Sequence, residues 1–323
     1  MRALAAERRE LIEALVAEVG SGRISAGLLE KDEHLSDALA ALFGLRLDGM
    51  QLVFCGGSSL SKAHRLIERM SEDADLKVVL SPEVLQLPRA QIRERLSRLK
   101  ATIGGALAAT GLIEDPDGSR ALNENRYFRS EWRYQAAYGS VVGLRPYLQV
   151  EFTVRTPVLP VVDLPILRLV DQLANRQGEV LQVPTVDLAE TVAEKVLSFL
   201  RRFAQYREGQ MRQDWDVALV RHLYDVHCAY RRDAGVLASA VVAFPMLVET
   251  DQKEFGRQFA AFAEHPRRVL EDALQRIGDD AQSQDEYERH LLPLIYGDVR
   301  PSYPEAIASF TLVAEAMLAS IPR

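Results

Sequence analysis

The chain has 323 residues, and its 39 lysines and arginines against 46 aspartates and glutamates give a formal net charge of −7. Hydrophobic residues make up 48% and charged residues 26%, which excludes disorder, collagen-like repeats and coiled coil as descriptions of the whole chain. The length predicts about two domains, and the negative charge argues weakly against a protein that coats nucleic acid.

The first part of the chain alternates between helical and strand-like patterns. Apolar residues recur at helical spacing in residues 1–46, where we expect two helices. Charged and apolar residues alternate in residues 73–80, which is typical of a strand with one buried face. The other elements expected here are a strand at 51–55, helices at 59–70 and 89–110, a turn at 116–125, and strands at 132–142 and 146–155.

The pattern changes after about residue 186, because the remaining sequence shows helical periodicity only. The sequence therefore predicts an α+β protein, in which residues 1–186 form a mixed β-sheet core with flanking helices and residues 187–323 form an α-helical bundle domain. Helices are expected at 188–206, 215–231, 255–276, 286–295 and 305–321.

Several features bear on where the protein works. The two cysteines, Cys55 and Cys228, form no CxxC pair, which excludes a zinc knuckle or a thioredoxin motif and favours a reducing compartment. The first residues are charged from position 2 on and lack the apolar stretch of a signal peptide. No run of about 18 apolar residues occurs, so no segment is expected to cross a membrane. These features predict a cytoplasmic protein.

A glycine-rich turn, Gly56-Gly57-Ser58-Ser59, follows the strand at 51–55 and leads into a helix. Glycines allow a ligand to approach the backbone closely, and the free N–H groups at the start of a helix attract phosphates. A plain structural turn would show the same four residues, so this motif alone leaves both interpretations open.

Asp73 and Asp75 are two residues apart on the expected strand, so both carboxylates project from one face. Negative charges this close repel each other strongly unless a cation lies between them. Oxygen ligands with open positions suit Mg²⁺. The alternative is an edge strand whose carboxylates are solvated.

Glu151 lies at the centre of the polar face of the strand at 146–155. Alone, a glutamate in such a place is ordinarily exposed to solvent and nothing more. Beside Asp73 and Asp75 it supplies a third carboxylate, and three carboxylates can hold two Mg²⁺ ions that bridge a triphosphate. The glycine turn, the Asp-x-Asp strand and the later glutamate together resemble the pattern of the DNA polymerase β-like nucleotidyltransferase superfamily.

A longer segment carries a more specific resemblance. The sequence GGSSLSKAHRLIERMSEDADLKV at 56–78 closely resembles the signature of the AbiEii/AbiGii toxin family of nucleotidyltransferases. That signature reads GG[ST]SLSK, followed by an apolar-Arg-apolar-Ser-Glu-Asp-apolar-Asp-Leu run. The matching positions are Gly56 to Lys62, and then Arg69, Ser71, Glu72, Asp73, Asp75 and Leu76.

Three shorter matches extend the resemblance over about residues 25–230. Residues 29–32 resemble the family's N-terminal Glu-Lys-Asp helix, although residues 33–35 replace the aromatics that often follow it. Glu194-Lys195 matches a later Glu-Lys helix. Residues 213–216 match an Arg/Lys-Asp-x-x-Asp segment imperfectly, because one residue separates the two acids and no basic residue directly precedes the first.

The resemblance implies roles for named residues. A lysine at 195 would neutralise a phosphate, and an aspartate at 216 would orient that lysine or the acceptor hydroxyl. Their alternatives are a solvated helix face and a helix cap. The implied catalytic residues are Asp73, Asp75, Glu151, Lys195 and Asp216, of which the first three hold the metal. The implied nucleotide-binding residues are Gly56, Gly57, Ser58, Ser59, Lys62 and Arg69.

The implied function is Mg²⁺-dependent transfer of an NMP from an NTP to an acceptor hydroxyl, and the acceptor that the resemblance implies is the 3′ end of a tRNA. The context would be a toxin–antitoxin or phage-defence system, with a cognate antitoxin as partner. Two Arg-rich segments, 89–100 and 201–212, are candidate contacts to an RNA backbone, although solvated helix faces would show the same charges. Two alternatives stay open: transfer to a small molecule, as in antibiotic-modifying enzymes, and a catalytically degenerate binding module.

Overall fold

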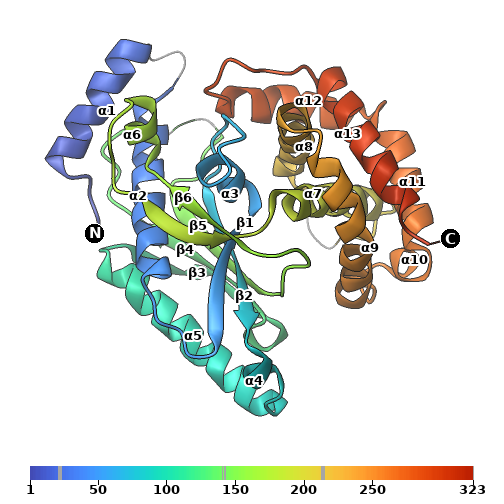
Figure 1. Cartoon of the computed structure of the whole chain (residues 1–323). Helices are drawn as coiled ribbons and strands as arrows, with labels where there is room; N and C mark the ends of the chain where they lie inside the picture. Colours follow the sequence, from blue (N-terminus) through green and yellow to red (C-terminus); the bar gives the residue numbers. More distant parts are fainter. Residues whose placement is uncertain (21–23, 140, 142, 212–214, 323) are drawn as a thin grey trace. The chain divides into compact units, whose positions relative to one another are not determined.

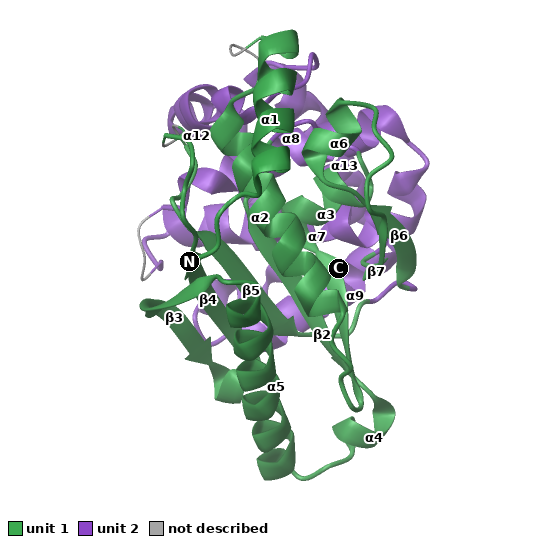
Figure 2. Cartoon of the chain, turned by 90° about the vertical axis from the view of Figure 1, so that its left-hand side faces the viewer, with its two compact units in different colours: residues 1–65, 70–157, 161–186 green, residues 66–69, 158–160, 187–323 purple. Residues whose placement is uncertain are grey.

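The computed structural model describes residues 1–20, 24–139, 141, 143–211 and 215–322 (Figure 1). The chain divides into two compact units (Figure 2). Unit 1 comprises residues 1–65, 70–157 and 161–186, and unit 2 comprises residues 66–69, 158–160 and 187–323. No described helix combines the length and the apolar character that crossing a membrane requires.

Unit 1 is built on a seven-stranded mixed sheet with the strand order β3-β4-β5-β2-β1-β7-β6. The strands β1 (Met50–Cys55) and β2 (Asp73–Leu80) are antiparallel, and β2 runs parallel to β5 (Leu148–Val154). This arrangement confirms the predicted mixed sheet. The remaining strands are β3 (Ile113–Leu122), β4 (Tyr127–Arg133), β6 (Val162–Ile166) and β7 (Leu181–Thr185).

Two helices share a core with the sheet of unit 1. Leu39 of α2 (Ala26–Phe43) and Leu96 of α5 (Arg89–Ala109) are buried in one cluster with Leu76 of β2 and Phe152 of β5. Because side chains alternate along a strand, the polar residues of β2 and β5 lie on the opposite face. The other elements of unit 1 are α1 (Ala6–Val19), α3 (Gly56–Lys62), α4 (Pro82–Leu85), α6 (Leu169–Leu173) and the 3₁₀ turn η1 (Asn123–Asn125).

Unit 2 is helical, as predicted, and Phe199 packs edge-on against Phe310 in its core with 5.2 Å between ring centroids. One long helix, α9, was not predicted. Before α9 lie α7 (Leu188–Arg207), the 3₁₀ turn η2 (Val217–Val220) and α8 (Arg221–Arg232). The others are α9 (Val236–Phe255), α10 (Ala260–Glu264), α11 (Pro266–Ile277), α12 (Ala281–Glu286), the π-turn η3 (Tyr287–Leu291), the 3₁₀ turn η4 (Leu292–Leu294) and α13 (Tyr303–Ala319).

The predicted helix at 59–70 is wrong in its second half. Helix α3 ends at Lys62, and Arg65 takes a left-handed backbone conformation with φ of 53°. The chain then joins unit 2, where Arg69 forms a β-bridge with Ile295. Contacts this distant in sequence override local helical periodicity.

The predicted turn at 116–125 and strand at 132–142 are also displaced. Residues 116–122 belong to β3, which pairs with β4 through a register shift between Asp115 and Arg120. The turn between these two strands is confined to η1, where three successive residues have φ between 49° and 66°. The polar, glycine-containing sequence of β3 explains why it does not look like a strand.

Candidate active site

The three predicted carboxylates lie on neighbouring strands of the unit 1 sheet. In the parallel β2–β5 pair, Asp75 is directly opposite Glu151, and Asp73 is opposite Gln149. All three acidic side chains are half-buried, whereas the alternate residue Ala74 is fully buried. Alternation therefore brings Asp73, Asp75 and Glu151 to one face of the sheet, as the sequence predicts.

Gly56 lies against the carboxylate of Asp75. Its φ is +73°, and a Cβ atom placed on it would lie 2.0 Å from Asp75 Oδ2 and 2.8 Å from Asp75 Cβ. Real Cβ atoms do not approach so closely, and L side chains rarely adopt this backbone conformation. Only glycine at position 56 therefore allows the Asp75 carboxylate to keep its place.

Replacing Gly56 by alanine should therefore displace the Asp75 carboxylate. We expect the free energy of unfolding to fall by about 1–3 kcal/mol and nucleotide transfer to fall more than tenfold. Thermal unfolding and a transfer assay measure the two effects. Gly20→Ala is the matched control, because Gly20 has φ of +92° but no atom within 4 Å of an added Cβ. Equal activity of the two variants would show that the Gly56–Asp75 contact is unimportant.

Two fully buried serines at the start of α3 donate hydrogen bonds to nearby backbone carbonyl groups. Ser58 Oγ donates a hydrogen bond to the carbonyl oxygen of Asp73. Ser59 Oγ donates to the carbonyl oxygen of Gly56 at 2.9 Å. Both hydroxyls thus hold the junction between β1, α3 and β2. Nucleotide contacts by Gly56, Gly57, Ser58 and Ser59 stay a prediction.

The carboxylates of the site already have protein partners. Arg145 Nη2 donates to Asp73 Oδ2 at 2.8 Å, and the Tyr127 hydroxyl donates to Glu151 Oε2 at 3.0 Å. Among the described residues, no three His, Cys, Asp or Glu side chains are gathered closely enough to hold an ion by themselves. Mg²⁺ ordinarily takes one or two protein carboxylates and completes its shell with water and substrate phosphates. The Asp73–Asp75 pair fits that kind of binding.

Lys62, a predicted nucleotide contact, is 5% exposed, and its ammonium lies 2.5 Å from Asp32 Oδ1. Asp32 also accepts a hydrogen bond from the backbone of Leu169 at 2.7 Å. Asp32 belongs to an unusual stretch of α2, residues 30–34, in which five successive charged or titratable side chains are buried. In this structure Lys62 therefore connects α3 to α2, and its contact with a nucleotide stays a prediction.

Unit 2 contains a buried cluster of two cations and one acid. Arg69 Nε and Nη2 donate to the two oxygens of Asp225 at 2.7 and 2.6 Å. Lys195 Nζ lies 2.7 Å from Asp225 Oδ2. Arg69, Lys195 and Asp225 are 2%, 7% and 0% exposed. One carboxylate cannot by itself neutralise two cations.

Asp225 was not predicted as a functional residue. The sequence carries a signal, however, because Asp225 lies between the apolar residues Tyr224 and Val226 on α8, where a charge is expected to need a buried partner. Burial raises its pKa, but Arg69 and Lys195 outweigh this effect and hold the pKa of Asp225 well below its usual range. Asp225 is therefore ionised at neutral pH.

His222 lies one helical turn before Asp225 on α8. Burial, followed by the charge of Lys195, lowers the pKa of His222 well below its ordinary value of 6.5. Its Nδ1 atom is buried without a hydrogen-bond partner. The imidazole is consequently neutral at pH 7 and adds no further charge to the triad.

Asp216 acts as a helix cap, the alternative that the sequence leaves open. Its Oδ1 accepts a hydrogen bond from the backbone of Ala218 at 2.9 Å at the start of η2, and its Oδ2 lies 2.8 Å from Arg202. Burial raises the pKa of Asp216, but Arg202 and the hydrogen bond from Ala218 together hold it below its ordinary value. Its catalytic role stays a prediction, and residues 213 and 214 of the same motif lie outside the described part of the chain.

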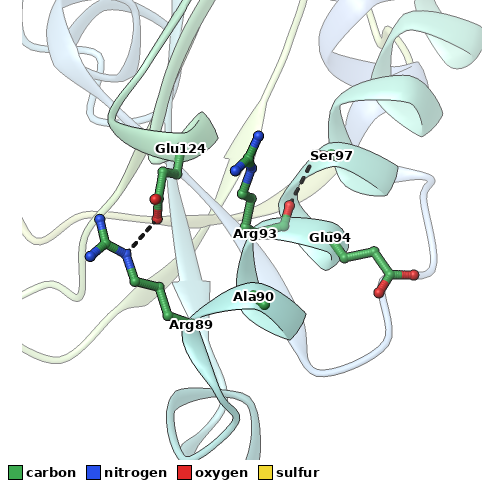
Figure 3. Close-up of a pocket in the computed structure, with 6 residues that line it drawn as sticks. All are labelled: Arg89, Ala90, Arg93, Glu94, Ser97 and Glu124. Atoms are coloured by element: carbon green, nitrogen blue, oxygen red, sulfur yellow. Dashed lines mark hydrogen bonds and ion pairs between the residues drawn. The ribbon is translucent and has the colours of Figure 1, made fainter.

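Unit 1 also has a cavity of about 660 Å³ at the N-terminal half of α5 (Figure 3). Arg89 Nε donates to Glu124 Oε2 at 2.8 Å, and Arg93 lies one turn further along the helix (Figure 3). The Asn125 side chain donates to Ser97 Oγ at 2.9 Å, which ties η1 to α5. The cavity is lined by Arg89, Ala90, Arg93, Glu94, Ser97 and Glu124.

Comparisons with known proteins identify the fold and the family. The chain is similar over 98% of its length to MenT4, a nucleotidyltransferase toxin from Mycobacterium tuberculosis H37Rv, with 90% of that chain covered, 19% identity and a TM-score of 0.57. This likeness shows a shared fold. No curated protein matches the sequence. A family model described as "Nucleotidyl transferase AbiEii toxin, Type IV TA system" matches residues 37–309. The protein therefore belongs to the AbiEii family of nucleotidyltransferase toxins of type IV toxin–antitoxin systems.

Proposed function

We propose that this nucleotidyltransferase moves an NMP from an NTP to a hydroxyl of an RNA acceptor, the 3′ end of a tRNA, in a Mg²⁺-dependent reaction. The observation that carries the proposal is the placement of Asp73, Asp75 and Glu151 on one sheet face, with Gly56 against Asp75. As a toxin of a type IV system, the protein also has an antitoxin as partner.

The proposed reaction is an in-line displacement. The acceptor hydroxyl attacks the α-phosphorus of the NTP, the bond between the α-phosphorus and the bridging oxygen breaks, and pyrophosphate leaves. Mg²⁺ bound with the triphosphate would offset negative charge on the attacking and leaving oxygens. Asp73 and Asp75 supply protein oxygens for that ion, and Glu151 lies beside Asp75 to take the proton or complete the coordination.

The triad in unit 2 supports the roles that the resemblance assigns to Lys195 and Arg69. Phosphate recognition requires cations that are held in place, and Asp225 holds both side chains within 2.7 Å. We assign Asp225 the part of a positioning residue, because it touches two cations and is fully buried itself. Phosphate oxygens are the anions that these two cations would bind.

The α5 cavity is our candidate contact to the RNA backbone. Replacing Arg89 and Arg93 together by alanine should weaken tRNA binding about tenfold and lower the slope of log affinity against log salt by about 1–2, because two phosphate contacts are lost. Fluorescence anisotropy at several salt concentrations measures both. Arg268 and Arg289, whose side chains are 80% and 72% exposed, form the control double variant. Equal affinity of the two double variants for tRNA would show that α5 does not contact the RNA.

The acceptor is tested by incubating the protein with each α-³²P-labelled NTP and Mg²⁺, with total tRNA or with a panel of aminoglycosides. Label on tRNA supports the proposal. Label on an aminoglycoside only would establish the small-molecule alternative. Mg²⁺-dependent NTP binding without transfer to any acceptor would favour the degenerate binding module.

A further inference from the structure

Arg145, in the loop before β5, connects the first aspartate of the candidate metal site to its neighbours. Its Nη2 donates to Asp73 Oδ2 at 2.8 Å, and its Nη1 donates to the side chain of Gln149 at 2.6 Å. Gln149 is the β5 residue directly opposite Asp73. The guanidinium therefore lies at the edge of the carboxylate face and is hydrogen-bonded to both Asp73 and Gln149.

The backbone of Arg145 is also hydrogen-bonded, to the side chains of Glu72 and Lys31. Its N–H donates to Glu72 Oε2 at 2.8 Å, and its Nε donates to Glu72 Oε1 at 3.4 Å. Lys31 Nζ donates at 2.6 Å both to Glu72 Oε2 and to the carbonyl oxygen of Arg145. Lys31 and Glu72 are 1% and 2% exposed. A chain of alternating charges, Lys31–Glu72–Arg145–Asp73, is thus buried at its Lys31–Glu72 end and places one guanidinium against Asp73.

Glu72 and Arg145 are both charged at neutral pH. Burial raises the pKa of Glu72, but Lys31 and Arg145 together hold it below its ordinary value. Burial lowers the pKa of Arg145, but Asp73 and Glu72 raise it above its ordinary value. The side chain of Arg145 is 31% exposed, whereas its backbone is hydrogen-bonded to the buried side chains of Lys31 and Glu72.

The position of Arg145 disfavours a metal ion bound to Asp73 without nucleotide. A divalent ion held by Asp73 Oδ2 would bring two or more positive charges beside the guanidinium, and like charges at such separations repel strongly. Arginine, however, has a planar fork that binds phosphate oxygens bidentately. A guanidinium that leaves Asp73 has a suitable new partner in the triphosphate that accompanies the metal.

We propose that Arg145 neutralises Asp73 while the site holds no metal, and exchanges Asp73 for the triphosphate when a metal–NTP complex binds. This inference rests on the proposed function of the Asp73–Asp75 site. Lys31 and Glu72 are positioning residues, because they fix the backbone from which the Arg145 side chain swings. The exchange makes the affinity for metal alone weaker than the affinity for metal with nucleotide.

The test is a Mn²⁺ titration of the full chain without nucleotide, in which electron paramagnetic resonance reports free Mn²⁺. Arg145→Gln should bind Mn²⁺ at least about fivefold more tightly than the unaltered protein, because the competing cation is gone. Arg133→Gln is the matched control, because Arg133 lies on β4 and pairs with Asp115, which is not a residue of the site. It should change Mn²⁺ affinity less than about twofold.

A second measurement tests whether Arg145 binds the triphosphate. Arg145→Gln should raise KM for the NTP about tenfold or more and change kcat less, whereas Arg145→Lys, which keeps the charge, should restore part of the NTP affinity. Unchanged or weaker Mn²⁺ binding by a folded Arg145→Gln variant would overturn the proposal, as would unchanged KM. The Mn²⁺ titration needs no acceptor, so failure to label tRNA would refute the proposed acceptor and leave this result standing.

Discussion

Asp75→Asn should lower nucleotide transfer at least about a thousandfold and leave the protein folded. The amide keeps the shape of the side chain but removes the negative charge that would hold a cation opposite Glu151. Loss of such charge stabilisation amounts to several kcal/mol, and each 1.36 kcal/mol corresponds to about a factor of ten in rate. Asp75 is half-buried beside Gly56, so the isosteric change fits without repacking. Single-turnover transfer of labelled NMP, with circular dichroism for the fold, measures both parts.

A matched control is available on the same sheet. Asp163→Asn also removes one carboxylate charge, but Asp163 is an exposed residue of β6. It should keep transfer activity within about twofold, since isolated surface charges contribute little. Full activity of Asp75→Asn would refute the placement of the transfer centre.

The second large effect is expected in stability. Asp225→Asn should lower the free energy of unfolding by about 3–5 kcal/mol, because the buried cations Arg69 and Lys195 then lose the charge of the carboxylate that they share. Chemical denaturation at pH 7 measures the difference. Asp285→Asn is the control, since Asp285 pairs with Arg289 on an exposed helix surface. It should change stability by less than about 0.5–1 kcal/mol.

The same triad predicts a pH dependence. Because the pKa of Asp225 is lower in the folded than in the unfolded chain, its contribution to stability is fully present above about pH 4–5 and is lost as the pH falls further. The stability difference between the unaltered protein and Asp225→Asn should therefore shrink in acid. A difference that stays constant from pH 7 to pH 3 would mean that Asp225 carries no such pKa shift.

Local patterns predict part of the carboxylate face. Asp73, Asp75 and Glu151 follow from alternation on two strands, and the glycine turn follows from four adjacent residues. The parallel pairing that sets Asp75 opposite Glu151 lies outside any local pattern, because it joins residues 76 positions apart. The family resemblance supplied that link.

The partners of the buried charges could not be predicted in the same way. Arg69 lies in a segment with helical periodicity, yet it leaves that pattern to bind Asp225, which is 156 residues away. Arg145 similarly joins Asp73 across 72 residues. Such pairs satisfy buried charges, and the sequence indicates only that a partner must exist. The negative net charge of the whole chain also gave no indication of a nucleic-acid partner. It averages over all residues and therefore does not reveal the local positive charge of the arginines in α5.

The most direct test compares α-³²P and γ-³²P labelled NTP in the presence of tRNA and Mg²⁺, with the unaltered protein and with Asp75→Asn. We expect label from the α-position to appear on the RNA, an equal amount of γ-label to be released as pyrophosphate, and neither signal with Asp75→Asn. Transfer of the γ-label to the RNA, or undiminished α-transfer by Asp75→Asn, would contradict nucleotidyl transfer at the Asp73–Asp75 site.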